Sequence, residues 1–439
     1  MRIGEFSTRT GVTVDALRHY MDLGLLVVEK RGGQYEFDER VKADLERLLQ
    51  LKDMGFSLAE IKMIFQFERL GVMTDYQKDL YYRGLYSQRI NTLRLEIESR
   101  QKALTALEGA ERTLMNAEEA RGDRLQQTVG LPLEALPLLA CSRCGSALSL
   151  SEGDVRDGKV IRGTLACVCD CGEEVGLVVE EGIVFAPELW ARQSSEFEVR
   201  RQAIEAKGNV SQAGNSAADF LEAYLTSTDP AYLDRVYEGL NWVRGRADFT
   251  GCRAALELGS GHGFYLRTVY DKLPEPMIYI AVDHDPERHR FLKKILEGAA
   301  ESRKIVLLCA DFRALPLKTD SFDVLMDFTG SSNYCFDNDG FLPSLVNPLM
   351  REEARLFASY IVFERFGLNT RIPAERRSWF TEAGVLEGLK SLGYKLDETY
   401  RTQTVSQGGV FEDYFEADER VKTVVVVGER GLAEVTAND

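Results

Sequence analysis

The sequence predicts a multidomain protein with an all-α winged helix-turn-helix, a long helix, a small β ribbon and a C-terminal α/β domain of the Rossmann-like kind. Three observations support this prediction. Short helical patterns broken by glycine precede one long helical pattern, five of the eight cysteines fall between Cys141 and Cys171, and strand and helix patterns alternate over 250–430. The chain has 439 residues, enough for about three domains.

Composition places the chain among ordinary globular proteins. Hydrophobic residues make up 44% and charged residues 28%, which argues against collagen, long disordered chains and coiled-coil fibres. The formal net charge is −16, so any DNA contact must come from a local patch. There is no signal-peptide pattern and no apolar run of 18 residues, so we expect no membrane span and a cytoplasmic location.

Residues 1–74 have the pattern of a helix-turn-helix with a wing. Gly11 suits the tight turn between two helices, and Gly24 suits a helix C-cap. The strand-like run 27–39, which surrounds two glycines, predicts a hairpin wing. A serine and a glutamate at the two ends of 57–60 form a capping box for a later helix pair.

This segment resembles the MerR family of winged helix-turn-helix regulators over about 70 residues. The matching residues are Ile3-Gly4-Glu5-Phe6, Gly11-Val12, Leu17-Arg18, Tyr20, Leu23-Gly24-Leu25-Leu26 and Gly55-Phe56-Ser57-Leu58. The resemblance implies that the second helix enters the major groove of double-stranded operator DNA, that the wing lies along the DNA backbone, and that the protein is a dimer. The residues that we expect to contact DNA are Arg2, Arg18, His19, Tyr20, Lys30 and Arg31.

Three departures from the family pattern weaken the expected binding. Asp15-Ala16 stands where the family has a basic or polar pair, His19 replaces the first tyrosine of a pair, and the wing reads Tyr35-Glu36-Phe37 without the usual arginine. Residues 1–68 contain ten basic and twelve acidic side chains. Because phosphate contacts dominate affinity for DNA, we expect weak binding or a special operator. The alternative is a helix-turn-helix used for protein contacts.

Residues 75–122 predict one long dimerisation helix. Apolar side chains recur at heptad spacing, interrupted only at Arg100 and Glu111. We call this row the heptad seam; its members are Tyr86, Ile90, Leu93, Ile97, Leu104, Leu107 and Leu114. A helix of this length is too long to be buried by a small domain, and MerR relatives dimerise through such a helix, so we expect a homodimer. The alternative is a helix that covers only the core of its own domain.

The cysteine cluster predicts a zinc ribbon over 138–186. Two cysteine knuckles, separated by a hairpin over 148–166, suit tetrahedral Zn²⁺ held by thiolates. Five cysteines compete for four positions. The pattern Leu139-x-Cys141 with Cys144-Gly145 is mirrored by Leu165-x-Cys167 with Cys171-Gly172. We therefore predict ligation by Cys141, Cys144, Cys167 and Cys171, with Cys169 as the alternative to Cys167, and a structural ion, because four thiolates leave no open position.

A strand that opens into a glycine-rich turn and a helix begins the domain over 250–430. The turn has the form Glu257-x-Gly259-x-Gly261-x-Gly263, and Asp283 ends the next strand 20 residues later, where an acid binds ribose hydroxyls. The competing ligands are NAD and S-adenosylmethionine (SAM). SAM is favoured because Glu257 would oppose an anionic pyrophosphate, because the turn is Gly-x-Gly-x-Gly, and because another acid, Asp311, follows a third strand.

This series resembles the class I SAM-dependent methyltransferases over about 180 residues. The matching features, in order, are Glu257 with the three glycines, Val282-Asp283, Ala310-Asp311, Leu315-Pro316 and Phe322-Asp323-Val324. The resemblance implies that Gly259 and Gly261 face the methionine part of SAM, that Asp283 holds the ribose, that Asp311 and Phe312 frame the adenine, and that Asp327 with Phe328 closes the pocket. The fold would be a doubly wound sheet with final strands at 411–415 and 424–427.

Methyl transfer from a sulfonium needs mainly positioning and desolvation, so no catalytic residue is assigned. His262 and Asp327 are weak candidates for a general base. Neither Asn-Pro-Pro-Tyr nor Pro-Cys follows the fourth strand, so by analogy a small-molecule acceptor is favoured over a base or glutamine. A helical cap or linker is expected at 187–249, with aromatic residues that either shape the acceptor site or form ordinary core: Phe220, Tyr224, Tyr232, Tyr237 and Trp242.

Three functions compete at this point. The first is a MerR-like transcriptional regulator that carries an active SAM-dependent methyltransferase. The second is a non-enzymatic regulator that uses the methyltransferase fold as a sensor of SAM or a metabolite. The third is an enzyme whose helix-turn-helix only mediates assembly.

Overall fold

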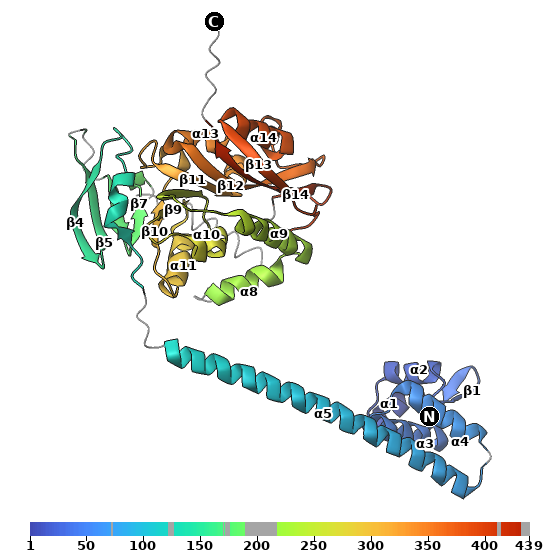
Figure 1. Cartoon of the computed structure of the whole chain (residues 1–439). Coiled ribbons are helices and arrows are strands. Elements are labelled where there is room, and N and C mark those ends of the chain that lie inside the picture. The colour runs from blue at the N-terminus through green and yellow to red at the C-terminus, as the bar shows by residue number, and fades with distance from the viewer. Residues whose placement is uncertain are drawn as a thin grey trace. The chain divides into compact units, whose positions relative to one another are not determined.

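A computed structural model describes residues 1–71, 73–121, 127–169, 171, 176–188, 217–410 and 414–431, in two compact units, Met1–Arg124 and Leu125–Asp439 (Figure 1). Within these ranges, no helix is both long and apolar enough to cross a membrane. Residues 189–216 of the predicted helical cap lie outside the described residues, as do Gly172 and the side chain of Phe220.

The first unit is a small helical domain with one hairpin, continued by a long helix. Its elements are α1 (Ile3–Thr10), α2 (Val14–Asp22), β1 (Glu29–Arg31), β2 (Gln34–Glu36), α3 (Glu39–Asp53), α4 (Leu58–Leu70) and α5 (Asp75–Arg121). The predicted turn chemistry is confirmed: Gly11 ends α1 in the left-handed conformation, and Ser57 with Glu60 forms a complete capping box on α4. Strands β1 and β2 pair antiparallel as the predicted wing.

A single apolar core holds the first unit together. Buried side chains from α1 to α4 form it, and Phe6 stacks on Phe37 at a ring distance of 4.6 Å. Tyr82, Leu85 and Tyr86 of α5 pack against this core. Helix α5 has 47 residues, which corresponds to about 70 Å at 1.5 Å per residue, so most of it extends beyond the core that it contacts.

The second unit begins with strands around the cysteine cluster and continues as an α/β domain. Its elements are β3 (Leu131–Pro132), η1 (Leu133–Leu138), β4 (Leu148–Arg156), β5 (Lys159–Cys167), β6 (Leu177–Glu180), β7 (Ile183–Phe185), α8 (Ala217–Ser227), α9 (Pro230–Arg246), β8 (Ala254–Leu258), α10 (Phe264–Val269), η3 (Tyr270–Lys272), β9 (Ile278–Asp283), α11 (Pro286–Glu297), β10 (Lys304–Cys309), η4 (Phe312–Ala314), β11 (Phe322–Phe328), α12 (Gly330–Asp337), α13 (Leu342–Val346), η5 (Asn347–Leu349), β12 (Met350–Arg365), η6 (Ala374–Phe380), α14 (Glu382–Ser391), β13 (Tyr394–Arg401) and β14 (Arg420–Arg430).

One twelve-stranded sheet runs through the described part of the second unit, in the order β13-β14-β12-β11-β8-β9-β10-β7-β6-β5-β3, with β4 paired to β5. Strands β8 to β12 are parallel to one another, and β14 is antiparallel to both β12 and β13. Helices α9, α10 and α11 lie on one side of the sheet, and α13 and α14 lie on the other (Figure 1). The predicted doubly wound, Rossmann-like architecture is confirmed.

The ribbon is not a separate module, which differs from the expected organisation. Its last strand, β7, pairs in parallel with β10, so that Ile183 lies opposite Leu307 and Phe185 lies opposite Cys309. All three residues of β7 are buried. The ribbon therefore covers what would otherwise be an exposed edge of the parallel sheet, and the two parts share one core.

The end of the chain differs from the sequence prediction in one strand. The predicted strand at 424–427 is confirmed within β14. The other expected strand, at 411–415, falls partly outside the described residues, and its described residues Tyr414 and Phe415 form a turn and a bend. The strand that pairs with the outer side of β14 is instead β13, in which exposed residues predominate over buried ones.

Candidate functional site

The candidate ligand site lies at the carboxyl ends of the parallel strands. The chain order reverses between β8 and β11: β9 and β10 follow on one side of β8, whereas β11 and β12 lie on the other. In open α/β sheets, ligands bind outside the strand ends at this switch point. The glycine-rich turn 259–263 leaves β8 there, and Asp283 and Asp311 leave β9 and β10 at the same edge.

Two glycines of the turn are required by close packing. Gly259 has φ +66°, and a Cβ on it would come within 2.8 Å of the Cα of Gly330, at the start of α12. Gly263 has φ +75°, and its Cβ would collide with the side chain of Leu292 in α11. The turn is thus pressed between the neighbouring elements, which fixes the direction in which its backbone amides point.

Asp283 joins the end of β9 to the glycine-rich turn. Its buried carboxylate accepts a 2.8 Å hydrogen bond from the backbone N–H of Gly261 and a 3.0 Å bond from that of Asp285. Arg288 and His284 lie 3.7 Å and 3.5 Å from its oxygens. Burial opposes ionisation, but the basic neighbours and the Asp285 amide outweigh it, so the pKa of Asp283 lies below its ordinary value. Asp283 is therefore a carboxylate at neutral pH.

Glu257, the last acid inside β8, has the opposite environment. Its side chain is fully buried, and its Oε2 has no hydrogen-bond partner among the described residues. Burial raises the pKa of Glu257 to about 8, with a hydrogen bond to Tyr279 acting against the shift. Glu257 is therefore mostly protonated at neutral pH.

Asp311 and Phe312 lie together after β10. Asp311 accepts a 2.9 Å hydrogen bond from the backbone N–H of Arg313 and also pairs with the Arg313 guanidinium at 3.0 Å and 3.1 Å. The ring of Phe312 meets the ring of Tyr334, from α12, edge to face at 6.2 Å. This pair of aromatic rings and the partly exposed Asp311 carboxylate form a surface suited to an adenine ring.

The two weak candidates for a general base lie in unfavourable surroundings. Asp327 is fully buried and accepts a 2.8 Å hydrogen bond from the backbone N–H of Ser331 and a second bond from the Ser331 hydroxyl, so it caps α12. Burial raises the pKa of Asp327 to about 6 despite these bonds. His262 packs edge to face on Phe291 at 4.9 Å, and burial together with the charge of Arg288 lowers its pKa to about 4.

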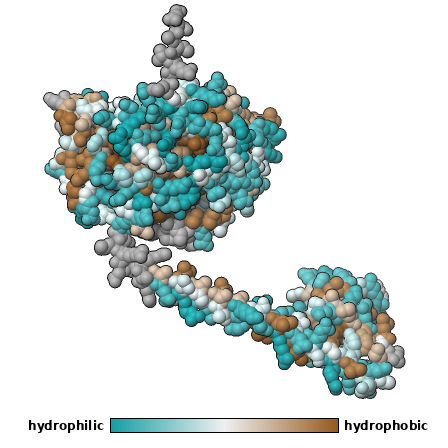
Figure 2. Space-filling model, in the orientation of Figure 1, coloured by the Kyte–Doolittle hydropathy of each residue, from teal (hydrophilic) through white to brown (hydrophobic). Residues whose placement is uncertain are grey.

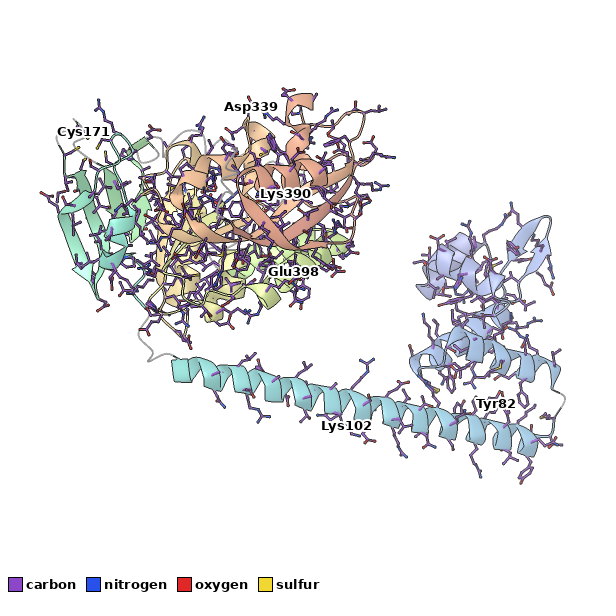
Figure 3. All side chains as sticks on the ribbon, turned by 45° about the horizontal axis from the view of Figure 1, so that its top comes forward. Tyr82, Lys102, Cys171, Asp339, Lys390 and Glu398 are labelled. Atoms are coloured by element: carbon purple, nitrogen blue, oxygen red, sulfur yellow. The ribbon has the colours of Figure 1, made fainter. Side chains whose placement is uncertain are left out.

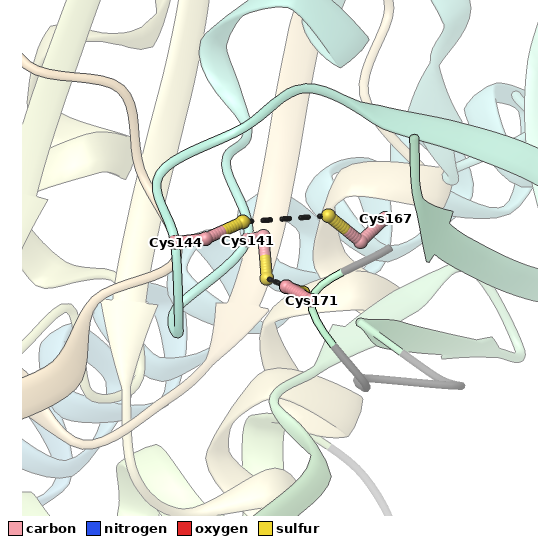
Figure 4. A group of neighbouring side chains, drawn as sticks. All are labelled: Cys141, Cys144, Cys167 and Cys171. Carbon is pink, nitrogen blue, oxygen red and sulfur yellow. Dashed lines mark hydrogen bonds between the residues drawn. The ribbon is translucent and has the colours of Figure 1, made fainter. Parts of the chain in front are cut away.

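Four of the five clustered cysteines converge as a metal-binding group (Figure 4). The Sγ atoms of Cys141, Cys144, Cys167 and Cys171 all lie within 4.8 Å of one another, with 3.9 Å between Cys141 and Cys171 and 3.5 Å between Cys144 and Cys167. Ligands at 2.3 Å in a tetrahedron stand about 3.8 Å apart, so the set is compatible with zinc. Hydrogen bonds from Ser146 lower the pKa of the Cys144 thiol to about 5, which favours the thiolate that binds metal.

The fifth cysteine remains an alternative ligand. The Sγ of Cys169 lies 3.2 Å from that of Cys144 and 3.3 Å from that of Cys167, and its side chain is exposed. The group whose four sulfur atoms all lie within 4.8 Å of one another is nevertheless the predicted one, with Cys167 and without Cys169.

The candidate DNA-contacting residues of the first unit fall into two groups. Arg2, Arg18, His19, Lys30 and Arg31 are exposed on α1, α2 and the wing. Arg18 lies 3.9 Å from Asp15 and Arg31 lies 3.5 Å from Glu36, so both basic side chains already face acids. Tyr20 is 5% exposed and belongs to the core, where its hydroxyl accepts a hydrogen bond from Lys52 at 3.4 Å.

Three residues of the site were not predicted from the sequence. Arg288 and Arg313 neutralise the two acids at the sheet edge, and Gly330 allows α12 to approach the glycine-rich turn. A signal for Arg313 was available, because an arginine two residues after Asp311 can return to its carboxylate. The role of Gly330 depends on a contact with Gly259, which lies far away in the sequence. The role of Arg288 depends on the side-chain rotamer that brings it to Asp283.

Comparisons with known proteins identify both units. Residues 1–68 match the family model of MerR HTH family regulatory proteins, and residues 256–339 match that of a methyltransferase domain. The chain therefore joins a MerR-type helix-turn-helix domain to a methyltransferase domain.

The curated relatives match a stretch of 63 residues. The nodulation protein NolA of Bradyrhizobium diazoefficiens is 41% identical over 63 residues, which cover 14% of this chain and 27% of that protein. The NolA protein of Bradyrhizobium elkanii is also 41% identical over 63 residues, which cover 29% of its length. The chain thus spans little more than a quarter of the relatives that it matches.

Solved structures are similar to the second unit. A SAM-dependent methyltransferase from Aquifex aeolicus is 14% identical, with a TM-score of 0.32, and the match covers 46% of this chain and 94% of that one. A phosphoethanolamine N-methyltransferase from Haemonchus contortus, solved with S-adenosyl-L-methionine, is 10% identical, with a TM-score of 0.33 and coverage of 45% and 53%.

Proposed function

We propose that this protein is a MerR-type transcriptional regulator that binds operator DNA as a homodimer and transfers a methyl group from SAM to a small molecule. The observation that best supports the catalytic half is the 2.8 Å hydrogen bond between the Gly261 amide and the Asp283 carboxylate. It holds an ionised acid beside a glycine-rich turn at the switch point of the sheet, where a nucleoside is expected.

The residues at this edge suit the parts of SAM. Asp283 would accept hydrogen bonds from the ribose hydroxyls, and the backbone of Gly259 and Gly261 would face the methionine part. Asp311 and Phe312 would frame the adenine. Asp327 is less suited to closing the pocket, because its oxygens are used within α12.

SAM supplies a methyl group on a sulfonium, and the reaction breaks that S–C bond as the acceptor atom forms a new one. The products are a neutral thioether and, where the acceptor carried a proton, a proton released to solvent. No strong base is required for an acceptor that is already nucleophilic. This suits the site, because the pKa of His262 is lowered and Asp327 caps a helix.

The four-cysteine group supports a structural zinc ion. Cys141, Cys144, Cys167 and Cys171 would hold it with no position left for a substrate. Because the knuckle and the sheet share one core, the ion would fix the part of the second unit that covers β10.

The heptad seam supports dimerisation. Beyond Leu93, its side chains are exposed in the part of the chain that the structure describes: Ile97 is 65% exposed and Leu107 is 69% exposed. In the space-filling view, apolar residues follow the long helix (Figure 2). A second copy of this helix would cover the row, and two helix-turn-helix domains would then present a symmetric DNA-binding surface in the cytoplasm, where operator DNA lies.

A second function, sensing without catalysis, is favoured by one observation. The two acids proposed to contact SAM are paired with Arg288 and Arg313 of the same chain, so a ligand that binds these acids would change both ion pairs. A ligand can act as a signal only if it binds one state of the dimer better than another.

Two experiments test the proposal together. Calorimetry measures the binding of SAM, and incubation with labelled SAM and a metabolite extract measures methyl transfer. We expect binding to the full chain, loss of binding in Asp283→Ala, and normal binding in Asp397→Ala, an exposed acid of β13. Turnover supports the enzyme, whereas binding without any turnover supports the sensor. Unchanged SAM affinity in Asp283→Ala would reject the ribose assignment.

A further inference from the structure

A buried arginine stands at a core-facing position of α9. Residues Tyr232, Arg235, Gly239 and Val243 are the buried positions of this helix and share one face, which packs on β14. Arg235 is only 2% exposed. Arginine is almost never fully buried unless it is paired, so its presence in this row calls for a partner.

In the described part of the chain, the hydrogen-bond acceptors that Arg235 reaches are hydroxyl oxygens, and it forms no ion pair there. Its Nη1 donates to Thr423 Oγ1 at 2.8 Å, and its Nη2 donates to the Tyr414 hydroxyl at 3.4 Å. The guanidinium lies over the Tyr232 ring at 4.1 Å, and its Nε has no hydrogen-bond partner there. Among the described residues, the charge is thus buried without an anion, and one donor has no acceptor.

The tyrosine hydroxyls around Arg235 form a connected set. The hydroxyl of Tyr232 lies 2.6 Å from that of Tyr414. Each hydroxyl can donate as well as accept a hydrogen bond, so the set contains donors of the kind that bind an anionic oxygen. A guanidinium ringed by hydroxyls is the chemistry that recognises a carboxylate or a phosphate.

The position of this set connects it to the proposed methyl-transfer site. Thr423 lies opposite Ile361 in the pairing of β12 with β14, near the carboxyl end of β12. Tyr414 contacts Phe336 of α12 at a ring distance of 5.0 Å. On the other side, Tyr224 contacts Phe264, the first residue of α10, at 5.5 Å. Helices α10 and α12 are the two that begin at the glycine-rich turn and at Gly330.

We propose that Arg235, with the hydroxyls of Tyr232, Tyr414 and Thr423, binds an anionic group, a carboxylate or a phosphate, of the small-molecule methyl acceptor. The role as acceptor site rests on the proposed methyltransferase function, whereas the anion site itself does not. Arg235 here is a binding residue: it binds the end of the acceptor that is remote from the reacting atom.

Calorimetry on the full chain tests this site with three probes of similar shape: benzoate, phenyl phosphate and the neutral benzamide. We expect one or both anions to bind at least about tenfold more tightly than benzamide, and Arg235→Met to remove that preference. The control is Arg246→Met, an arginine on the same helix that lies over Trp242 and is partly exposed, and it should bind the anions normally.

The variants also separate binding from folding. Arg235→Met should raise the midpoint of thermal unfolding of the free protein, because it removes an uncompensated buried charge. If it fails to fold, Arg235→Lys and Tyr414→Phe provide the test, and each should weaken anion binding by about tenfold while the far-UV spectrum is unchanged. Equal affinity for anions and benzamide in the wild type, or full anion binding in the Arg235 variants, would overturn the site.

A parallel titration with SAM separates this inference from the function on which it rests. Anion binding without SAM binding would keep the anion site and reject its role as a methyl-acceptor site. SAM binding without anion preference would reject the anion site and leave the proposed function standing.

Discussion

The backbone N–H of Ala140, which immediately precedes the first cysteine of the four-cysteine group, donates a 3.0 Å hydrogen bond to the carbonyl oxygen of Pro316. Leu139 forms a bridge with Leu317, and the Lys318 N–H donates to the Leu138 carbonyl at 2.9 Å. The cysteine knuckle is thereby attached to the segment that follows Asp311. The metal group and the proposed adenine contact belong to one continuous piece of structure.

Removal of the metal should therefore weaken SAM binding. Cys144→Ser should lower the zinc content from about one ion per chain to far less, because three thiolates hold zinc poorly, and should raise the dissociation constant for SAM several-fold. Elemental analysis and calorimetry measure the two effects. Cys169→Ser is the matched control and should keep both zinc and SAM affinity. Loss of zinc in Cys169→Ser, with retention of zinc in Cys167→Ser, would show that Cys169 is a ligand in place of Cys167.

The exposed seam of α5 predicts a dimer that one charge can disrupt. Ile97→Lys should raise the dissociation constant of the dimer more than tenfold, since burying an isoleucine stabilises by about 1.5–3 kcal/mol and the change occurs in both copies. Sedimentation equilibrium measures the constant. Leu95 is equally exposed, at 68% against 65%, but lies off the seam, so Leu95→Lys should leave the dimer intact. Equal effects of the two variants would contradict the seam as the interface.

The contribution of Glu257 to stability should fall as the pH rises between about pH 6.5 and 8, whereas Cys144, whose pKa is lowered to about 5, acts with the opposite sign there. The folded pKa of Glu257, about 8, exceeds its ordinary value of 4.5, so the folded chain retains a proton that the unfolded chain has lost, and this contribution to the unfolding free energy decreases as pH rises. His262 and His289, with pKa values lowered to about 4, act with the opposite sign, but only below pH 6.5. Asp327 acts with the same sign as Glu257, but mainly below pH 6.

Urea unfolding of the wild type and of Glu257→Gln measures this effect. The wild type should lose up to about 1.4 kcal/mol of unfolding free energy per pH unit relative to the variant across that window. Other groups, including the cysteines, titrate in both proteins and cancel in the difference. Parallel stability curves for the two proteins would show that Glu257 ionises normally.

Local patterns allowed most of the elements to be predicted from the sequence. The capping box at Ser57, the wing between β1 and β2, and the hairpin between the cysteine knuckles each depend on residues that are close in the chain. The four cysteines were predicted from spacing because zinc geometry restricts their arrangement.

The features that were not predicted depend on long-range contacts. The pairing of β7 with β10 joins residues more than a hundred positions apart, and no local pattern distinguishes it from an isolated ribbon strand. The role of Asp327 as a helix cap depends on where α12 begins. The resemblance to the MerR family placed Tyr20 among the DNA contacts, but the packing of α2 turns this side chain into the core.

The ion pair between Arg18 and Asp15 predicts that an acidic residue limits DNA binding. The two side chains are 3.9 Å apart on α2, and Asp15 is almost fully exposed, at 95% of its side chain. Asp15→Asn should release Arg18 for phosphate and remove one repulsive charge, so affinity for DNA should rise, whereas Arg18→Ala should lower it and reduce the salt slope by about 1. Gel shift on the DNA upstream of the protein's own gene, at low salt and at several salt concentrations, measures both changes.

Glu353→Gln, an exposed acid of the second unit, is the charge-matched control and should leave DNA binding unchanged. If neither α2 variant alters retardation while the wild type binds, α2 is not the recognition helix; if the wild type is not retarded at low salt, the helix-turn-helix serves assembly instead.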